Sequence, residues 1–337
     1  MKTPLFFLCV LSISISFAQD IPEKIPAFPD YFNQHKDTIS HYLKAYNSNS
    51  VLKSLKKETI YSGEKLSSEE LSFNKNGIKI NKDGLPVTKR IDSSVENTSI
   101  KIYTPLNKNE EDYRVTDGEG YVLAEEYKYN SDQLLEVYVK YLEDTSYDVI
   151  TYVYNKHQQL VEKTTKCFHG VSEDSYGRVY LKDEPTTTII ETGVYKKGRL
   201  VKLFKEEMVN EFQYHYIEQT EHQIEYGKNN LPKVVYKNVV LEDKDAKKAT
   251  KHTYKLKLDY TPKHHLHTAT VYDKDETEKE KVLYTYSNNR LKKITITPSE
   301  NNSVGECHIV YNKNNSITTI NLKLNENESE IYIYEYH

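Results

Sequence analysis

Residues 284–291 read Tyr284-Thr285-Tyr286-Ser287-Asn288-Asn289-Arg290-Leu291: a strand that ends in an aromatic residue, a turn, and then an aliphatic residue. The same order returns in residues 309–317, from Ile309 through Tyr311 to Ile317. The copies place their strand-ending tyrosines at Tyr129, Tyr154, Tyr195, Tyr226, Tyr260, Tyr286, Tyr311 and Tyr336. Four of the intervals between these tyrosines are 25 or 26 residues, which indicates that one structural unit is repeated.

The spacing inside each unit predicts a β-hairpin. An aliphatic residue follows the tyrosine by five or six positions, which leaves a turn of about four residues. A unit this small cannot bury its own apolar face, so the copies must pack side by side. We therefore expect an all-β fold, an antiparallel β-meander of hairpin repeats with about sixteen strands, either extended or partly coiled.

The second strand of several hairpins changes its alternation. Leu291 is followed by Ile294 and Ile296, and Ile317 by Ile320 and Leu322. A shift of one residue would turn side chains to the opposite face, so either a bulge follows the turn or the first aliphatic residue belongs to the turn.

The N-terminal end has the features of a secretory signal peptide. Lys2 precedes an apolar run over residues 5–17, which ends Ser16-Phe17-Ala18. Cys9 lies inside this run, and we expect it to be removed with the signal at residues 1–18. No later stretch is apolar enough to span a membrane. The sequence therefore predicts an exported protein, periplasmic or extracellular.

The rest of the chain divides into three parts. Residues 19–57 begin with a proline-containing lead, after which Asp30 is placed to cap a helix that runs to about Tyr46. We expect this helix to cover one end of the sheet, because a terminal strand otherwise exposes unpaired backbone groups. Residues 58–125 are typical of irregular β-structure with degenerate repeats, and residues 126–337 form the repeat region.

Composition narrows the classes of function. The chain has 46 basic and 50 acidic residues, and this near-balance argues against a nucleic-acid partner. It has 30 tyrosines and no tryptophan, a composition that suits a pleated surface of aromatic and β-branched residues.

The repeats resemble the tyrosine–aspartate (YD) repeat of RHS-type proteins, whose units read Tyr-x-Tyr-Asp, a turn, then Gly-Arg-Leu. The matching residues are Tyr127, Tyr129 and Asn130; Tyr152, Tyr154 and Asn155; Gly198-Arg199-Leu200; and Asn289-Arg290-Leu291. The resemblance covers residues 126–337, and in this chain Asn, Ser, Gly, Thr or Lys replaces the family's aspartate. It implies a long antiparallel sheet able to coil into a shell, and a role in carbohydrate binding known for some members.

The paired tyrosines of each strand are the candidate binding residues. They lie two positions apart and so share one face of the sheet: Tyr127, Tyr129, Tyr152, Tyr154, Tyr284, Tyr286, Tyr334 and Tyr336. Cross-strand packing is one role for them. The other is an aromatic platform that stacks on a glycan or accepts a partner protein of the envelope or the extracellular space.

The remaining reactive residues give no recognisable catalytic motif. Cys167 and Cys307 predict a disulfide or two buried thiols, and a bridge would require the sheet to curl or the loops to reach. His264, His265 and His267 lie at a hairpin turn without supporting ligands, and we expect no metal and no cofactor. We favour an exported, non-enzymatic binding or scaffold protein. The alternative is a secreted or periplasmic hydrolase of envelope or nutrient polymers, with its site in the long insertions at 165–190 or 236–252.

Overall fold

A computed structural model describes most of the chain after its N-terminal region. The described residues are 25–33, 36, 38–39, 55–62, 67–73, 79–80, 90–93, 99–105, 121–142, 146–168, 171–173, 179–181, 184–211, 214–298, 305–323 and 329–336. The predicted signal peptide and Cys9 lie outside these residues.

Within these ranges the structure is almost entirely antiparallel β. Twenty strands form one sheet and two more form a separate hairpin. The elements are η1 (Tyr31–Asn33), β1 (Leu55–Ser62), β2 (Ser67–Phe73), β3 (Lys79–Ile80), β4 (Arg90–Ser93), β5 (Ser99–Pro105), β6 (Tyr121–Tyr129), β7 (Leu135–Tyr141), β8 (Tyr147–Tyr154), β9 (Leu160–Phe168), β10 (Val171–Glu173), β11 (Val179–Leu181), β12 (Thr187–Lys196), β13 (Arg199–Glu211), β14 (Tyr214–Tyr226), β15 (Pro232–Asp243), β16 (Lys248–Tyr260), β17 (Leu266–Asp273), β18 (Glu278–Ser287), β19 (Arg290–Pro298), β20 (Gly305–Tyr311), β21 (Ile317–Lys323) and β22 (Ser329–Tyr336).

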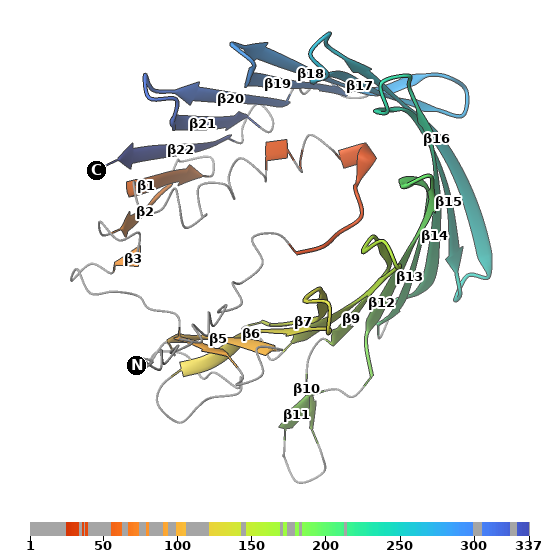
Figure 1. Ribbon diagram of the computed structural model, residues 1–337. Helices are drawn as coiled ribbons and strands as arrows, with labels where there is room; N and C mark the ends of the chain where they lie inside the picture. The colour runs from red at the N-terminus through yellow and green to blue at the C-terminus, as the bar shows by residue number, and fades with distance from the viewer. Residues whose placement is uncertain are drawn as a thin grey trace, which may run out of the picture.

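The large sheet follows the order of the chain and curls on itself. Each strand from β4 to β9 and from β12 to β22 pairs with its neighbour in sequence, β9 pairs with β12, and β22 pairs with β1. Strands β2 and β3 then continue the sheet beyond β1, so among the described strands β3 and β4 are the two edges and the sheet is not closed. Figure 1 shows the strands around most of a ring. The predicted all-β meander is confirmed, and of the two predicted shapes it is the coiled one.

The hairpin turns use two geometries. In one, a four-residue turn ends in a residue with positive φ, as at Gln133, Gln158, Asn230, His264 and Asn315. In the other, two residues with positive φ close the turn directly, as at Lys197-Gly198 and Asn288-Asn289, which is the type I′ geometry that suits the strand twist.

Of the two explanations for the changed alternation, the structure shows the bulge, which lies beside the strand-ending tyrosines. Thr285 pairs with Lys293 while Tyr286 pairs with Leu291, so Lys292 is the extra residue. The same register shift occurs at Tyr129, Tyr154, Tyr195, Tyr226, Tyr260 and Tyr311. The bulge explains the change of alternation along the second strand, since it returns the aliphatic residues to the apolar face.

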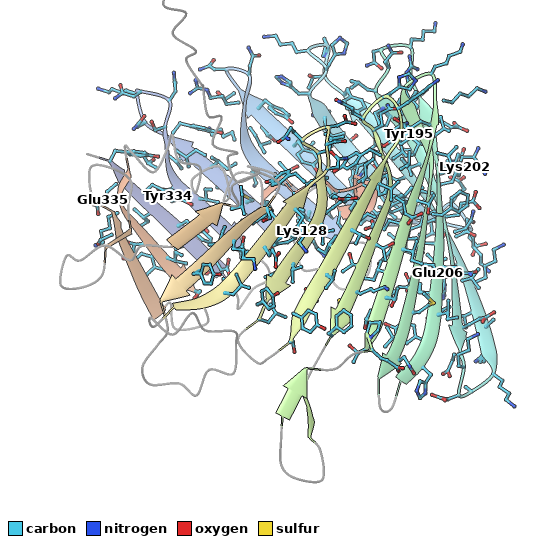
Figure 2. All side chains as sticks on the ribbon, turned by 60° about the horizontal axis from the view of Figure 1, so that its bottom comes forward. Lys128, Tyr195, Lys202, Glu206, Tyr334 and Glu335 are labelled. Carbon is cyan, nitrogen blue, oxygen red and sulfur yellow. The ribbon has the colours of Figure 1, made fainter. Side chains whose placement is uncertain are left out.

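The apolar core lies on the inner face of the curled sheet. One row of buried side chains crosses neighbouring strands in register, from Ile224 to Val235 and Leu256. Another crosses from Tyr284 to Ile294, Cys307 and Leu322. The outer face carries the alternate residues, which include Lys128, Lys202 and Glu206 (Figure 2).

The N-terminal segment, residues 25–39, differs from its prediction. Asp30 does cap a turn, because its Oδ1 accepts hydrogen bonds from the amides of Phe32 and Asn33, each at 3.2 Å. That turn is the three-residue 3₁₀ turn η1, and Lys36, Thr38 and Ile39 are helical; the predicted course to Tyr46 lies outside the described residues. The segment does not cap one end of the sheet, because its apolar side chains pack against the inner face instead (Figure 1).

Candidate functional site

The eight tyrosines predicted to bind a ligand all lie on the inner face. Tyr127, Tyr129, Tyr152, Tyr284 and Tyr334 are buried, while Tyr154, Tyr286 and Tyr336 are partly exposed. They come from β6, β8, β18 and β22, so they belong to separate parts of the curled sheet. Their packing is direct: the rings of Tyr127 and Tyr138 stack with centroids 4.9 Å apart. A binding role for this set stays a prediction.

Burial also changes the chemistry of these tyrosines. Desolvation, the largest cause, raises the pKa of Tyr127, and its hydrogen bond to Glu125 adds to the effect. Desolvation likewise raises the pKa of Tyr152, which is 3% exposed. Within the described part of the chain the Tyr152 hydroxyl has no hydrogen-bond partner. These phenols are therefore neutral core groups at physiological pH.

Of the two states expected for Cys167 and Cys307, a disulfide or two thiols, the structure has two thiols. Both thiols are free: Cys167 lies in β9 and is partly exposed, and Cys307 is buried in β20. Burial raises the pKa of each thiol to about 12, and for Cys167 a hydrogen bond to Asp148 adds to this. The sheet does curl, but β9 and β20 lie at separate positions around it (Figure 1), so the two strands are not neighbours.

The three histidines at the β16–β17 turn do not gather around one point. His264 has a φ of 65° in the turn, and its Nδ1 lies 3.3 Å from the side-chain Nδ2 of Asn229. The ring of His265 packs against Tyr286 at 4.8 Å. Among the residues that the structure describes, no group of three or more His, Cys, Asp or Glu side chains is placed to hold a metal ion.

A groove lies on the outer face of β12–β16. Its volume is about 510 Å³. The lining residues are Ile190, Thr192, Phe204, Lys205, Glu206, Gln219, Thr220, Glu221, Asn238, Val240 and Lys251. Lys205 and Thr220 belong to the inner-face alternation, so only their main chain can contribute to its floor.

The pairing of the strands builds the groove from two rows of side chains. In one row, Thr192, Phe204, Glu221 and Asn238 lie opposite one another in turn. In the next row, Ile190, Glu206, Gln219, Val240 and Lys251 follow the same strands. Apolar and polar side chains therefore alternate across one continuous surface.

Phe204 is the aromatic residue of the groove. Its side chain is 39% exposed, which is unusual for phenylalanine in the body of a long strand. The ammonium group of Lys202 lies 5.7 Å from the ring centroid. Glu221, opposite Phe204, accepts a 2.9 Å hydrogen bond from the same ammonium group. The ring is therefore held beside an ion pair and keeps an open face.

The amides and carboxylates of the groove are oriented by their neighbours. The Nε2 of Gln219 donates to Glu206 at 2.7 Å. The hydroxyl of Thr253 donates to the Oδ1 of Asn238 at 3.0 Å, which directs the amide so that its amino end is the part available to a ligand. Glu206 and Glu221 are matched in charge by Lys202 and Lys251. The groove therefore suits a neutral ligand that both donates and accepts hydrogen bonds.

Sequence reasoning identified part of this region but not its key residues. Ile190 lies in one of the two long insertions named as hosts for a hidden site, and Asn238, Val240 and Lys251 lie in the other. Phe204, Glu206, Gln219 and Glu221 were missed. The sequence does hold a signal for Phe204, in the stretch Lys202-Leu203-Phe204-Lys205-Glu206. There an aromatic residue lies on the face of the strand that carries charged residues in the other repeats.

Comparisons with known proteins give only remote likenesses. No protein-family model matches the chain, and no curated protein matches it. Among solved structures, a porin-like protein from Bacteroides vulgatus aligns with 84% of this chain and 98% of its own, at 11% identity and a TM-score of 0.31. A porin-like protein from Bacteroides uniformis aligns with 60% of this chain and 92% of its own, at 10% identity and a TM-score of 0.25. No helix in the described residues has the length and apolar character needed to cross a membrane.

Proposed function

We propose that this chain is an exported, non-enzymatic binding protein and that the groove on the outer face of β12–β16 binds a neutral glycan. The observation that carries the proposal is the exposed ring of Phe204 among oriented polar side chains. The apolar face of a sugar ring packs on an aromatic ring, while its hydroxyl groups need nearby donors and acceptors. Glu206, Gln219, Asn238 and Lys251 offer both.

Charge balance supports a neutral ligand over an anionic one. The groove and its edge hold two carboxylates and two ammonium groups, and Lys202 already pairs with Glu221. An anionic polymer would meet no excess of positive charge here. Burial of the inner tyrosines also favours the outer face as the place where a ligand first makes contact.

The turns support the further proposal that the repeats are of the tyrosine–aspartate kind. The Oδ1 of Asn155 accepts hydrogen bonds from the amides of His157 and Gln159, and the Oδ1 of Asn312 accepts one from Ser316. An aspartate at these positions would accept the same bonds, which gives a physical reason for the family's consensus residue.

The experiment is a binding screen followed by calorimetry. The mature protein is screened against immobilised neutral, acidic and amino-substituted oligosaccharides, and the hits are titrated. We expect binding to neutral oligosaccharides, and about a tenfold or greater loss of affinity for Phe204→Ala. Val310→Ala is the matched control, because Val310 is also an exposed apolar residue of the outer face but lies on β20. No binding, or equal effects of both substitutions, would overturn the proposal.

The hydrolase alternative has a separate readout. Glu206 and Glu221 are diagonal neighbours on β13 and β14, and paired carboxylates are what a glycosidase requires. Both are already engaged, Glu221 by Lys202 and Glu206 by Gln219. We therefore expect no release of reducing sugar from a bound oligosaccharide. Release that stops in both Glu206→Gln and Glu221→Gln would establish the enzyme instead.

A further inference from the structure

The inner wall of β12–β16 holds residues 25–33, which cross it as a proline-containing segment outside the sheet. Residues 25–30 have no regular secondary structure, and the segment includes Pro26 and Pro29. None of the described strand pairings involves it. Side chains therefore carry its attachment to the wall, and three aromatic residues provide the main contacts: Phe28, Tyr31 and Phe32.

Phe28 occupies a position that exists only because residue 193 is glycine. A Cβ atom added at Gly193 would lie 2.5 Å from the Cε1 of Phe28. Leu200 closes the same position, with its Cδ1 2.9 Å from that added atom. Gly193 lies within β12 and needs no unusual backbone conformation, so the strand itself gives no reason for glycine there. The absent side chain makes room for the ring.

Tyr31 enters a cluster of strand-ending tyrosines. It is 8% exposed, and desolvation, followed by the neighbouring phenols of Tyr226, Tyr260 and Tyr195, raises its pKa. Tyr31 and Tyr226 share a hydrogen bond, and the Tyr226 hydroxyl already donates to the carbonyl of Leu200 at 2.8 Å. Tyr31 must therefore be the donor to Tyr226. A phenylalanine here would leave that acceptor unused.

Phe32 covers a buried histidine. Its ring lies 5.8 Å from the ring of His222, and the ammonium group of Lys237 lies 5.6 Å from the Phe32 centroid. His222 is 9% exposed, and among the described residues neither of its ring nitrogens has a hydrogen-bond partner. The wall thus holds an unused donor and an unused acceptor directly under the segment.

We propose that the inner wall of β12–β16 is a recognition groove for a proline–aromatic polypeptide segment, and that residues 25–33 occupy it in cis. Short segments with two prolines three positions apart, here Pro26 and Pro29, dock into aromatic-lined grooves because their extended form is ordered in advance. The chain supplies its own ligand at a high effective concentration, so a free segment of the same chemistry competes only when the cis segment is weakened. The free histidine nitrogens give such a partner a hydrogen bond that the cis segment does not make.

The test uses the full mature chain and a fluorescein-labelled peptide with the sequence of residues 25–33. In the chain, Phe28→Ala with Tyr31→Ala removes two anchors and leaves the wall intact. We expect fluorescence anisotropy to show binding of the peptide to this double variant, about tenfold or more tighter than to the wild-type chain. A peptide carrying Phe28→Ala is the control for sequence dependence. It should bind the double variant no more tightly than the unchanged peptide binds the wild-type chain.

Gly193→Ala distinguishes the proposed groove from any other site. Added to the double variant, it blocks the position of the Phe28 ring and should abolish peptide binding. Gly305→Ala is the matched control, because it also adds a methyl group within a strand, but the nearest atoms to that group belong to Ile296, at 3.4 Å, and Lys323, and not to the segment. Circular dichroism must show the same β content for every variant.

Three outcomes would overturn the proposal: a folded double variant that does not bind the peptide, equal binding by the wild-type chain, or undiminished binding after Gly193→Ala. Trypsin cleavage after Lys36 provides a second measurement without added peptide. Gly193→Ala alone should speed cleavage there, whereas Gly305→Ala should not. Equal cleavage in both variants would show that Phe28 does not hold the segment, and would also overturn the proposal.

Discussion

The phenol hydroxyl of Tyr154 donates a hydrogen bond of 2.9 Å to the main-chain carbonyl of Leu135 on the neighbouring strand. Tyr226 makes the same bond to Leu200, Tyr311 to Leu291 and Tyr336 to Ile317. In each pair the acceptor is the first or second residue of the strand that follows the preceding repeat's turn. The strand-ending tyrosine therefore ties its own repeat to the turn of the one before, which explains why the position favours tyrosine over phenylalanine.

Replacing this tyrosine should weaken the contact between repeats. Tyr154→Phe keeps the ring but leaves the Leu135 carbonyl without the donor, and we expect a loss of about 1 kcal/mol in the free energy of unfolding. Urea denaturation followed by circular dichroism measures it. Tyr236→Phe, on the outer face of β15, is the control and should change stability by less than half as much. Equal losses of stability in Tyr154→Phe and Tyr236→Phe would show that the hydrogen bond to Leu135 does not stabilise the contact between repeats.

The turn asparagine should be replaceable by aspartate but not by alanine. The Asn155 Oδ1 accepts hydrogen bonds from the amides of His157 at 2.8 Å and Gln159 at 3.1 Å. Asn155→Ala removes both bonds and should cost about 1 kcal/mol, whereas Asn155→Asp keeps an oxygen in place and should cost much less. Thermal unfolding of the two variants checks the order. A lower melting temperature for Asn155→Asp than for Asn155→Ala would contradict this prediction.

Gly198 should resist substitution for a backbone reason alone. Its φ is 76°, and a Cβ atom added there would meet nothing within 4 Å. Gly198→Ala should therefore destabilise the protein by about 1 kcal/mol through left-handed strain and not through a clash. Gly198→Asn should recover part of the loss, because asparagine tolerates this conformation, as Asn289 does at a φ of 64°. Equal melting temperatures for the alanine and asparagine variants would contradict this.

His222 should make stability depend on pH. Burial first, and then the charges of Lys237 and Lys205, lower its pKa from 6.5 to about 4, against an opposing effect of Asp30. The unfolded chain therefore binds the proton more readily, and stability falls as pH decreases from about 6.5 to about 4. The full loss is about 3 kcal/mol, because each pKa unit corresponds to about 1.4 kcal/mol.

The control for this pH dependence is a variant in which residue 222 cannot ionise. Urea midpoints between pH 4 and pH 7 are compared for the wild type and His222→Gln, and the other titrating groups act equally in both proteins. We expect the wild type to lose more stability than the variant over this range. Parallel curves would mean that His222 is not held in the neutral form.

The two cysteines should be thiols in protein that is purified without reductant. Treatment of the denatured mature chain with iodoacetamide, without reductant, should add two carbamidomethyl groups, at Cys167 and Cys307. In the folded chain Cys307 should react far more slowly, because it is buried and its pKa is raised to about 12. A mass showing no added group would indicate the disulfide that the structure lacks.

Local features of the fold were predictable from the sequence. Strand, turn and bulge are all encoded within about ten residues, as in Tyr284 to Ile294, so alternation and turn chemistry suffice to predict them. The N-terminal cap at Asp30 is local in the same sense and is confirmed, whereas the predicted place of the segment at one end of the sheet is wrong.

The curl of the sheet and the outer groove depend on relations between distant strands. Nothing near Glu206 indicates that Gln219 and Lys251 share a surface with it, because that neighbourhood follows from the registers of β13, β14, β15 and β16. The contact of Phe28 with Gly193 spans a still longer stretch of the chain. A glycine inside a strand, as at Gly193, is typical of a close approach by another group, but the sequence does not indicate which group approaches.

The pairing of β1 with β22 limits the order in which the strands of the sheet can pair during synthesis and folding. Hairpins such as β18–β19 need only their own residues and can form as soon as these are made. Strand β1 can pair with β2 early, but its pairing of Thr59 with Ile333 must wait until β22 has been synthesised. A pairing across so long a loop is slow to form. Until then the edge of β1 that will face β22 has unpaired backbone groups that other strands can bind, and the step that completes the sheet comes last.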